Sequence, residues 1–332
     1  MDLPSKLDTW CAVVNIFAAS KTAVSKWEIA RTRLLSDGVN HLAVFTGKEG
    51  NAMQLTKTAC ADGYRRFIAV GGDGTVHDVL QGIMCFIEES VISGRPVSLS
   101  DFLMAVIPLG SGNDWIKTAG IPADIDQAAS LIASGETACQ DVVKVSLLDP
   151  HSIPAMKPLN TVYMANVGGV GLDARVCVSV NKAKSQGKRG KFLYVKALAD
   201  AIMKRVPTSV AAGCDGVQVF SGKYLSMSLG IGKYSGGGMR QTPDAVMDDG
   251  LLDLTVIPDL PLMKIAKEAP KLFSGRLNMV PELVMTRGKS IEVLTADELV
   301  EVDGEVVGCT PVRFDVMTEQ LPIRVPRRHM LS

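Results

Sequence analysis

The sequence predicts two domains, an N-terminal α/β domain with a parallel sheet and a C-terminal domain resembling an antiparallel β-sandwich. Up to about residue 140, β-type runs alternate with amphipathic helical patterns, which is typical of parallel strands joined by helices. Beyond that point short β-type runs separated by turn residues dominate. The 332 residues can bury two cores. We therefore expect domains at 1–140 and 141–317, with residues 318–332 able to return to the first.

Strands and helices are expected to alternate along the first domain. The expected strands are 10–17, 41–46, 66–70 and 102–108, and the expected helices are 22–35, 51–62, 75–88 and 124–134. The carboxyl ends of parallel strands share one rim of the sheet, where ligands bind in such folds. Asn15, Thr46, Gly71 and Gly110 fall at these ends.

The sequence predicts that the second domain consists mainly of strands. They are expected at 142–148, 161–167, 216–220, 225–231, 251–257, 290–294, 299–302 and 312–316. One helix is expected at 192–205, and residues 323–326 form a strand that can rejoin the first domain.

Composition excludes several classes of protein. The 35 basic residues balance 35 acidic ones, so no overall field attracts nucleic acid. No apolar run reaches the roughly 18–20 residues that span a bilayer, and the first residues do not resemble a signal peptide. The seven cysteines form no CxxC pair, which favours reduced thiols without a zinc site. We expect a cytoplasmic protein that is at most peripheral to a membrane.

The most informative motif is Val70-Gly71-Gly72-Asp73-Gly74-Thr75, between the apolar run 67–69 and a helical pattern. Glycines between a strand and a helix expose backbone N–H groups beside the positive end of the helix dipole, which suits a phosphate. Asp73 can face a metal ion or a nucleotide hydroxyl. A tight turn with an Asp cap explains the motif equally well.

A second loop of this kind follows the strand 102–108. Gly110, Ser111 and Gly112 can donate to phosphate oxygens, and Asn113 and Asp114 precede the next helix. Taken alone, the loop is best explained by helix capping. Its pairing with the glycine motif on a neighbouring strand end favours nucleotide binding.

These two loops resemble the diacylglycerol kinase catalytic domain family, which includes bacterial lipid kinases and their sphingosine kinase relatives. The family's GGDGT and P-x-G-T-x-N-D-F patterns match residues 71–75 and 108–115, with Ser111 in place of Thr. Further segments similar to family motifs lie at 166–174, 190–194, 236–252 and 303–305, so the resemblance covers nearly the whole chain.

The resemblance implies an ATP-dependent lipid kinase that phosphorylates a hydroxyl of a diacylglycerol-like or sphingoid lipid with Mg²⁺. The first domain would bind ATP, and the second would carry the lipid. The implied ATP contacts are Gly71, Gly72, Asp73, Gly74, Thr75, Val76, His77, Thr46 and Ser111. Gly110, Asn113 and Asp114 join them as candidates from the second loop.

The chain departs from the family after its first strand. The family shows N-P-x-x-G, a small residue and Lys, whereas residues 15–21 keep Asn15 and Lys21 but lack the Pro and the Gly. Ala19 cannot adopt a positive φ without strain. Asn15 and Lys21 therefore remain candidate contacts, with a plain strand end and a surface lysine as the alternative.

Asp303-Gly304-Glu305 lies between β-type runs, and Asp-Gly at such a place predicts a hairpin turn. The resemblance adds that Glu305 is the proton acceptor and Asp303 its acidic neighbour. A lipid hydroxyl needs a carboxylate to take its proton as the phosphate transfers.

The segment 246–251 offers hard oxygen ligands that suit magnesium. The resemblance implies that Asp249 binds a metal ion together with the carbonyls of Val246 and Leu251. The alternative is an Asp-Gly turn before the next strand.

Five cations lie within residues 182–191, which suits docking on an anionic bilayer or simply a solvated loop. A homodimer is compatible with the sequence. Two other functions stay open: a kinase similar to NAD kinase, whose family shares the GGDGT loop, and a non-catalytic sensor of nucleotide or lipid. The identity of the acceptor lipid does not follow from the sequence.

Overall fold

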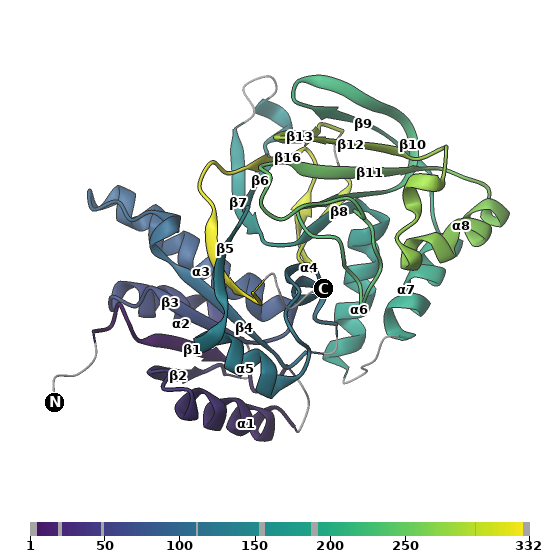
Figure 1. Ribbon diagram of the computed structural model, residues 1–332. Coiled ribbons are helices and arrows are strands. Elements are labelled where there is room, and N and C mark those ends of the chain that lie inside the picture. Colours follow the sequence, from purple (N-terminus) through teal and green to yellow (C-terminus); the bar gives the residue numbers. More distant parts are fainter. Residues whose placement is uncertain are drawn as a thin grey trace. The chain divides into compact units, whose positions relative to one another are not determined.

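The computed structural model describes residues 5–18, 22–47, 50–110, 112–152, 157–186, 192–295 and 297–327. The chain divides into unit 1, residues 1–140 with 319–332, and unit 2, residues 141–318 (Figure 1).

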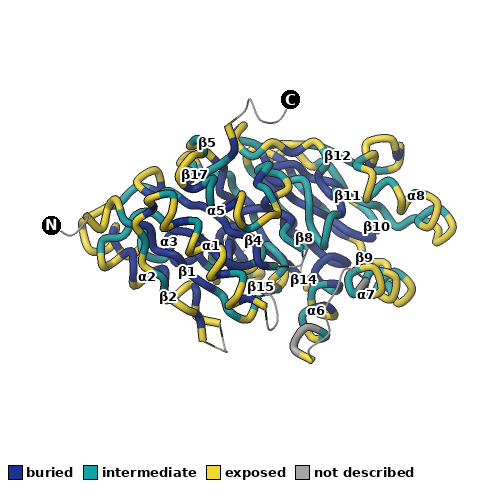
Figure 2. Tube along the Cα trace, turned by 60° about the horizontal axis from the view of Figure 1, so that its bottom comes forward, coloured by how far each residue is buried: buried dark blue, intermediate teal, exposed yellow. Residues whose placement is uncertain are grey.

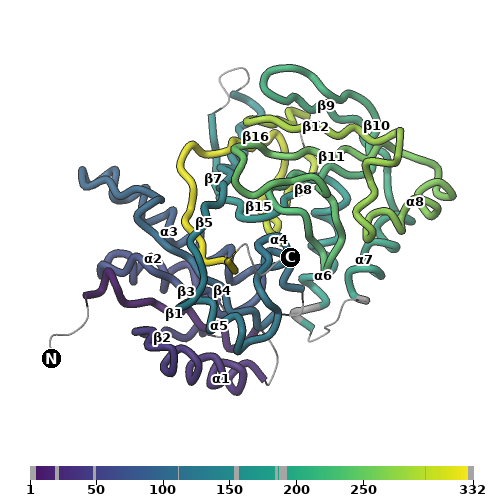
Figure 3. The backbone as a smooth tube through the Cα atoms, in the orientation of Figure 1, coloured from purple at the N-terminus to yellow at the C-terminus, as the bar shows by residue number. Residues whose placement is uncertain are grey.

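The described part of unit 1 contains a six-stranded sheet in the order β2-β1-β3-β4-β17-β5. Strands β2, β1, β3, β4 and β17 are parallel, and β5 runs antiparallel to β17. The C-terminal strand therefore lies between two strands of the first half of the chain (Figure 3). The strands are β1 (Trp10–Val14), β2 (His41–Phe45), β3 (Arg66–Gly71), β4 (Leu103–Pro108), β5 (Glu136–Gln140) and β17 (Leu321–Val325).

Five helices accompany this sheet in the described residues. They are α1 (Ala23–Ser36), α2 (Ala52–Ala61), α3 (Asp73–Ile92), α4 (Asp114–Ala119) and α5 (Ile125–Ser134), with the 3₁₀ turn η2 (Leu99–Asp101). One core joins Trp27 of α1 to Ile68 and Ile107 in the middle of the sheet, all of them buried. This burial of aliphatic and aromatic surface fixes the sheet that carries the glycine loops.

The described part of unit 2 forms an 11-stranded antiparallel sheet with the path β15-β14-β8-β10-β9-β13-β16-β6-β7, and β11 and β12 branch from β10. The strands are β6 (Val143–Leu148), β7 (Pro158–Met164), β8 (Val167–Gly171), β9 (Thr208–Cys214), β10 (Val217–Gly230), β11 (Leu252–Pro258), β12 (Val284–Gly288), β13 (Ser290–Val293), β14 (Leu299–Val302), β15 (Glu305–Cys309) and β16 (Val312–Val316). The predicted fold class is confirmed.

The helices of unit 2 are α6 (Leu172–Ser185), α7 (Phe192–Met203) and α8 (Leu262–Ser274), and its 3₁₀ turns are η3 (Pro150–Ser152) and η4 (Leu277–Met279). Among the described helices of both units, none combines the length and the hydropathy needed to cross a membrane.

Several boundaries differ from the sequence prediction for local reasons. The predicted strand 10–17 stops at Val14 because the Asn15 side chain accepts a hydrogen bond from the Phe17 N–H and turns the backbone. The predicted strand 161–167 is interrupted because the N–H groups of Ala165 and Asn166 donate to Asp303. The two strands predicted at 216–220 and 225–231 are one long strand, β10.

Candidate functional site

Two glycine loops of unit 1 lie against each other at the carboxyl ends of β3 and β4. The N–H groups of Leu109 and Gly110 both donate to the carbonyl of Gly71, at 2.7 and 3.2 Å. A Cβ atom at Gly110 would lie 2.7 Å from the Cα of Gly72, and one at Gly71 would lie 2.1 Å from Thr75 Oγ1. No side chain fits at either place. The structure thus brings the predicted residues 71–75 together with Gly110 and Asn113.

Asp73 braces the two loops. It is the first residue of α3, and its carboxylate accepts a hydrogen bond from the Trp115 N–H at the start of α4, at 2.9 Å. Burial, followed by the charge of Asp114, raises the pKa of Asp73 from 3.8 to about 6. Asp114 is itself buried and forms an ion pair with Lys117.

Helix capping does not account for Asn113. The residue stands at the N-cap of α4 in a left-handed conformation, with φ 48°, but its side chain makes no capping hydrogen bond. Its Nδ2 instead donates to the carbonyl of Gly110, at 2.8 Å. Its buried Oδ1 has no hydrogen-bond partner in the structure.

The other two strand ends reach the same rim of the sheet. Asn15 Nδ2 donates to Thr75 Oγ1 at 3.2 Å, and the N–H of Asn15 donates to the carbonyl of Val70. Thr46 follows β2; it is buried, and its hydroxyl has no hydrogen-bond partner. A buried hydroxyl without a partner is costly and is a natural contact for a ligand.

The remaining predicted contacts are placed as follows. Gly74 is exposed in the first turn of α3, whereas Val76 and His77 are buried in that helix. Gly72 at the N-cap carries no side chain to occupy the first N–H groups of α3. Lys21 and Ser111 lie outside the described residues. The bare helix start and the Thr46 hydroxyl offer hydrogen-bond donors that suit phosphate oxygens, whereas the Asn113 amide oxygen is an acceptor and suits a hydroxyl or amino group of a ligand.

In unit 2, Asp303 and Gly304 form the two-residue turn between β14 and β15, as predicted, with φ values of 52° and 91°. Both carboxylate oxygens of Asp303 accept backbone hydrogen bonds at 2.9 Å, from Ala165 and Asn166. Asp303 therefore fixes the turn against the segment before β8. Glu305 is exposed and accepts a hydrogen bond from Asn181 Nδ2, at 3.3 Å.

Sequence reasoning missed Glu301, which lies beneath this turn. Its buried carboxyl group accepts a hydrogen bond from the Gly304 N–H at 2.8 Å. Burial raises the pKa of Glu301 well above its ordinary value, and the charge of Asp173 adds to the effect. The available signal was an acidic residue within the apolar run 299–302.

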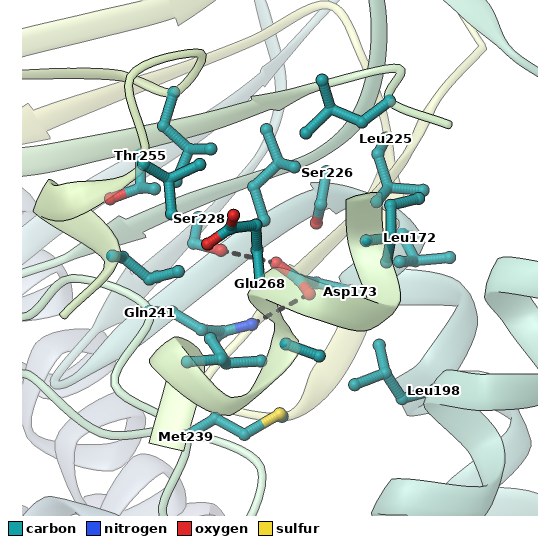
Figure 4. A pocket seen from close by; sticks show the side chains of 18 of the residues that line it. Leu172, Asp173, Leu198, Leu225, Ser226, Ser228, Met239, Gln241, Thr255 and Glu268 are labelled. Atoms are coloured by element: carbon teal, nitrogen blue, oxygen red, sulfur yellow. Dashed lines mark hydrogen bonds between the residues drawn. The ribbon is translucent and has the colours of Figure 1, made fainter. Parts of the chain in front are cut away.

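A second missed group is Asp173, which lines a pocket of about 740 Å³, a volume that includes space open to solvent (Figure 4). Its carboxylate accepts hydrogen bonds from Ser228 Oγ at 2.7 Å and from Gln241 Nε2 at 2.9 Å. Burial raises the pKa of Asp173. The Thr255 hydroxyl, in the same wall, is buried without a hydrogen-bond partner.

Most of this pocket is aliphatic. Leucine, isoleucine and valine side chains from α6, α7, β10, β11, α8 and η4 supply much of its lining. A mainly apolar pocket with a few polar groups along one wall suits a ligand with hydrocarbon chains and a small polar head.

In the loop expected to hold a metal ion, the Asp249 carboxylate already interacts with other residues of the protein. Asp249 accepts a hydrogen bond from the Leu251 N–H at 3.1 Å and forms an ion pair with Arg287 at 2.8 Å. Arg287 also pairs with Asp253, at 3.0 Å. Among the described residues, no cluster of three or more His, Cys, Asp or Glu side chains could hold a metal ion. A metal ion bound by Asp249 with the carbonyls of Val246 and Leu251 stays a prediction.

The cationic segment 182–191 is described only in part. Residues 187–191 lie outside the described residues, so the structure does not test membrane docking by this segment.

Comparison with known proteins identifies similar chains along nearly the whole length. Residues 9–145 match the diacylglycerol kinase catalytic domain, and residues 166–325 match the YegS C-terminal NAD kinase beta sandwich-like domain. A Xanthomonas euvesicatoria protein named "probable lipid kinase YegS-like" is 26% identical over 286 residues, which is 85% of each chain. A diacylglycerol kinase of Staphylococcus carnosus is 25% identical over 291 residues, covering 87% of this chain and 86% of that one.

The fold is shared with a solved structure. A crystal structure of a diacylglycerol kinase from Bacillus anthracis superposes with a TM-score of 0.71 at 22% identity. The superposition covers 98% of this chain and 100% of the Bacillus anthracis chain.

Proposed function

Because the chain belongs to the diacylglycerol kinase catalytic domain family, we propose that it transfers the γ-phosphoryl group of ATP to a hydroxyl of a diacylglycerol-like or sphingoid lipid. One observation carries the proposal for this chain: only glycine fits at Gly110, where a Cβ would meet Gly72 of the other loop, and at Gly71, where it would meet Thr75 in the first turn of α3. With no side chains at these positions, phosphate oxygens can approach the first N–H groups of α3, which have no partner within the helix.

The acceptor side of the proposal rests on unit 2. The aliphatic pocket beside α8 supports a lipid acceptor, because hydrocarbon chains gain free energy when they leave water for such a lining. Asp173, Ser228 and Gln241 give the pocket a polar wall that can bind a head-group hydroxyl.

Glu305 is the proposed general base. Its exposed carboxylate takes the proton of the lipid hydroxyl while the hydroxyl oxygen bonds to the γ-phosphorus and the bond to the ADP oxygen breaks. Asp303 acts as a positioning residue, since both of its carboxylate oxygens hold the turn in place. Glu301, whose pKa is raised, holds its proton more strongly than an ordinary glutamate, which limits the negative charge near the base.

The Glu305→Gln variant tests this assignment. Loss of a general base should lower kcat by about 100-fold or more, whereas the exposed side chain contributes little to folding. Transfer of radiolabel from [γ-³²P]ATP to lipid measures the activity, and Glu292→Gln on β13 is the matched control. Full activity of Glu305→Gln would remove Glu305 as the base.

A further inference from the structure

Helix α8 carries two apolar faces, one toward the pocket and one toward solvent. Ile265 and Leu272 line the pocket, yet none of the helix residues is buried. At 3.6 residues per turn, Leu262, Ala266, Pro270 and Phe273 follow one another along the other side, with Met263 beside them, and all five are exposed. We call these five residues the α8 face.

The α8 face is unusual for a surface helix, whose outer side is normally polar. Met263 is 87% exposed, and Phe273 and Leu262 are 48% and 42% exposed. Adjoining apolar residues of this kind mark an interaction surface rather than scattered exposure.

Neighbouring segments extend the apolar surface. Met203 at the end of α7 and Val206 just beyond it are 70% and 72% exposed. Arg205 ties this end to the segment before α8, because its Nε pairs with Asp259 at 3.1 Å and its Nη2 donates to the carbonyl of Leu260 at 2.9 Å. In Figure 2 exposed stretches of α7 and α8 contrast with the buried strands beside them.

The charge around the α8 face indicates its partner. Residues 261–282 contain four cations against two carboxylates, Glu268 and Glu282, which form ion pairs with Lys271 and Lys264. The cations are Lys264, Lys267, Lys271 and Arg276. Of these, the three lysines occupy the side of α8 next to the apolar stripe. An apolar helical face edged by cations suits the surface of an anionic bilayer. The same excess of positive charge opposes pairing of this surface with a second copy of itself.

We propose that the α8 face docks the protein on anionic lipid membranes. This inference rests on the proposed lipid kinase function in one respect: a helix that touches the bilayer on one side and the pocket on the other would let an acyl chain pass from the membrane to the pocket.

Sedimentation with vesicles of phosphatidylglycerol and phosphatidylcholine tests the proposal without relying on catalysis. The double variant Met263→Asp with Phe273→Asp should bind these vesicles about tenfold more weakly, because two apolar side chains no longer enter the interface. Leu159→Asp on β7 is the control, since Leu159 is also apolar and 70% exposed but belongs to a different element. Its binding should equal that of the unchanged protein.

Phosphorylation of a short-chain, water-soluble diacylglycerol separates docking from catalysis, and both variants should retain that activity. Unchanged vesicle binding by the double variant would overturn the proposal. It would also be overturned if the unchanged protein were a dimer in solution and the double variant a monomer, since the face would then be an interface between copies. If the unchanged protein bound the vesicles, the double variant bound them more weakly and neither phosphorylated any lipid, the proposed function would be contradicted. The docking surface would still be supported.

Discussion

Asp73 illustrates how one carboxylate can join two loops at a cost in stability. It accepts the Trp115 N–H and thereby holds the second glycine loop, but it does so where burial raises its pKa from 3.8 to about 6. The carboxylate that is expected to face a metal ion or a nucleotide hydroxyl thus already holds the second glycine loop through Trp115.

The raised pKa of Asp73 predicts a specific pH dependence. Between pH 3.8 and about 6 the folded protein binds more protons than the unfolded chain, so the free energy of unfolding falls as pH rises through this window. Asp73→Asn keeps an acceptor for Trp115 without the charge. The variant should be more stable than the unchanged protein by about 2–3 kcal/mol near pH 8, with a much smaller gain near pH 4.

Urea unfolding followed by tryptophan fluorescence reports the unfolding of unit 1, which contains Asp73. All three tryptophans of the chain, Trp10, Trp27 and Trp115, belong to this unit. An equal difference between the two proteins at both pH values would contradict the explanation.

Thr46 offers a test of ligand binding at the residue scale. Its buried hydroxyl lacks a hydrogen-bond partner, so Thr46→Val should leave the free energy of unfolding unchanged or raise it by about 1 kcal/mol. If the hydroxyl contacts ATP, the same change should weaken binding of a non-hydrolysable ATP analogue by about three- to tenfold. Calorimetric titration measures the affinity. Unchanged affinity would remove Thr46 from the proposed ATP contacts.

At the scale of elements, unit 2 contains two turns of one design. Asp215-Gly216 joins β9 to β10 and Asp303-Gly304 joins β14 to β15, each with positive φ at both residues. In both turns the aspartate accepts two backbone N–H groups from another segment; those bonded to Asp215 come from Lys289 and Ser290.

Comparing variants of these two turns distinguishes a structural role of Asp303 from a role in catalysis. Asp215→Asn and Asp303→Asn should each destabilise unit 2 by about 1–3 kcal/mol, because each weakens a charged acceptor of two N–H groups. Only Asp303→Asn should lower kcat, since it displaces the neighbouring Glu305. Circular dichroism and the kinase assay give the two readouts. Equal activity of both variants would reduce Asp303 to a turn residue.

The elements that the sequence predicted well are those with a clear period. Helices such as α1 and strands such as β14 follow from their apolar spacing. Strand β8 was missed because three of its five residues are glycines, which are rare in strands. The structure explains one of these glycines, because a Cβ at Gly169 would lie only 2.6 Å from the Cβ of Asp173. Helix α8 was missed although its amphipathic spacing was present, because Pro270 interrupts the pattern.

For the molecule as a whole, the sequence predicted the two-domain architecture and the family from the order of its motifs. It did not predict the buried acids Glu301 and Asp173 or the apolar pocket. These features join residues far apart in the chain, such as Asp173 with Ser228 and Gln241, and become visible only when strands and helices of unit 2 are assembled. The roles of the site residues remain predictions that depend on the reaction itself.

The most direct measurement of the central claim is the transfer of label from [γ-³²P]ATP in the presence of a mixed panel of diacylglycerols, sphingoid bases and NAD, with each product identified by mass spectrometry. A lipid kinase built on the packed glycine loops should label a lipid hydroxyl and leave NAD unlabelled. Labelled NAD, or ATP binding without transfer to any lipid in the panel, would contradict it.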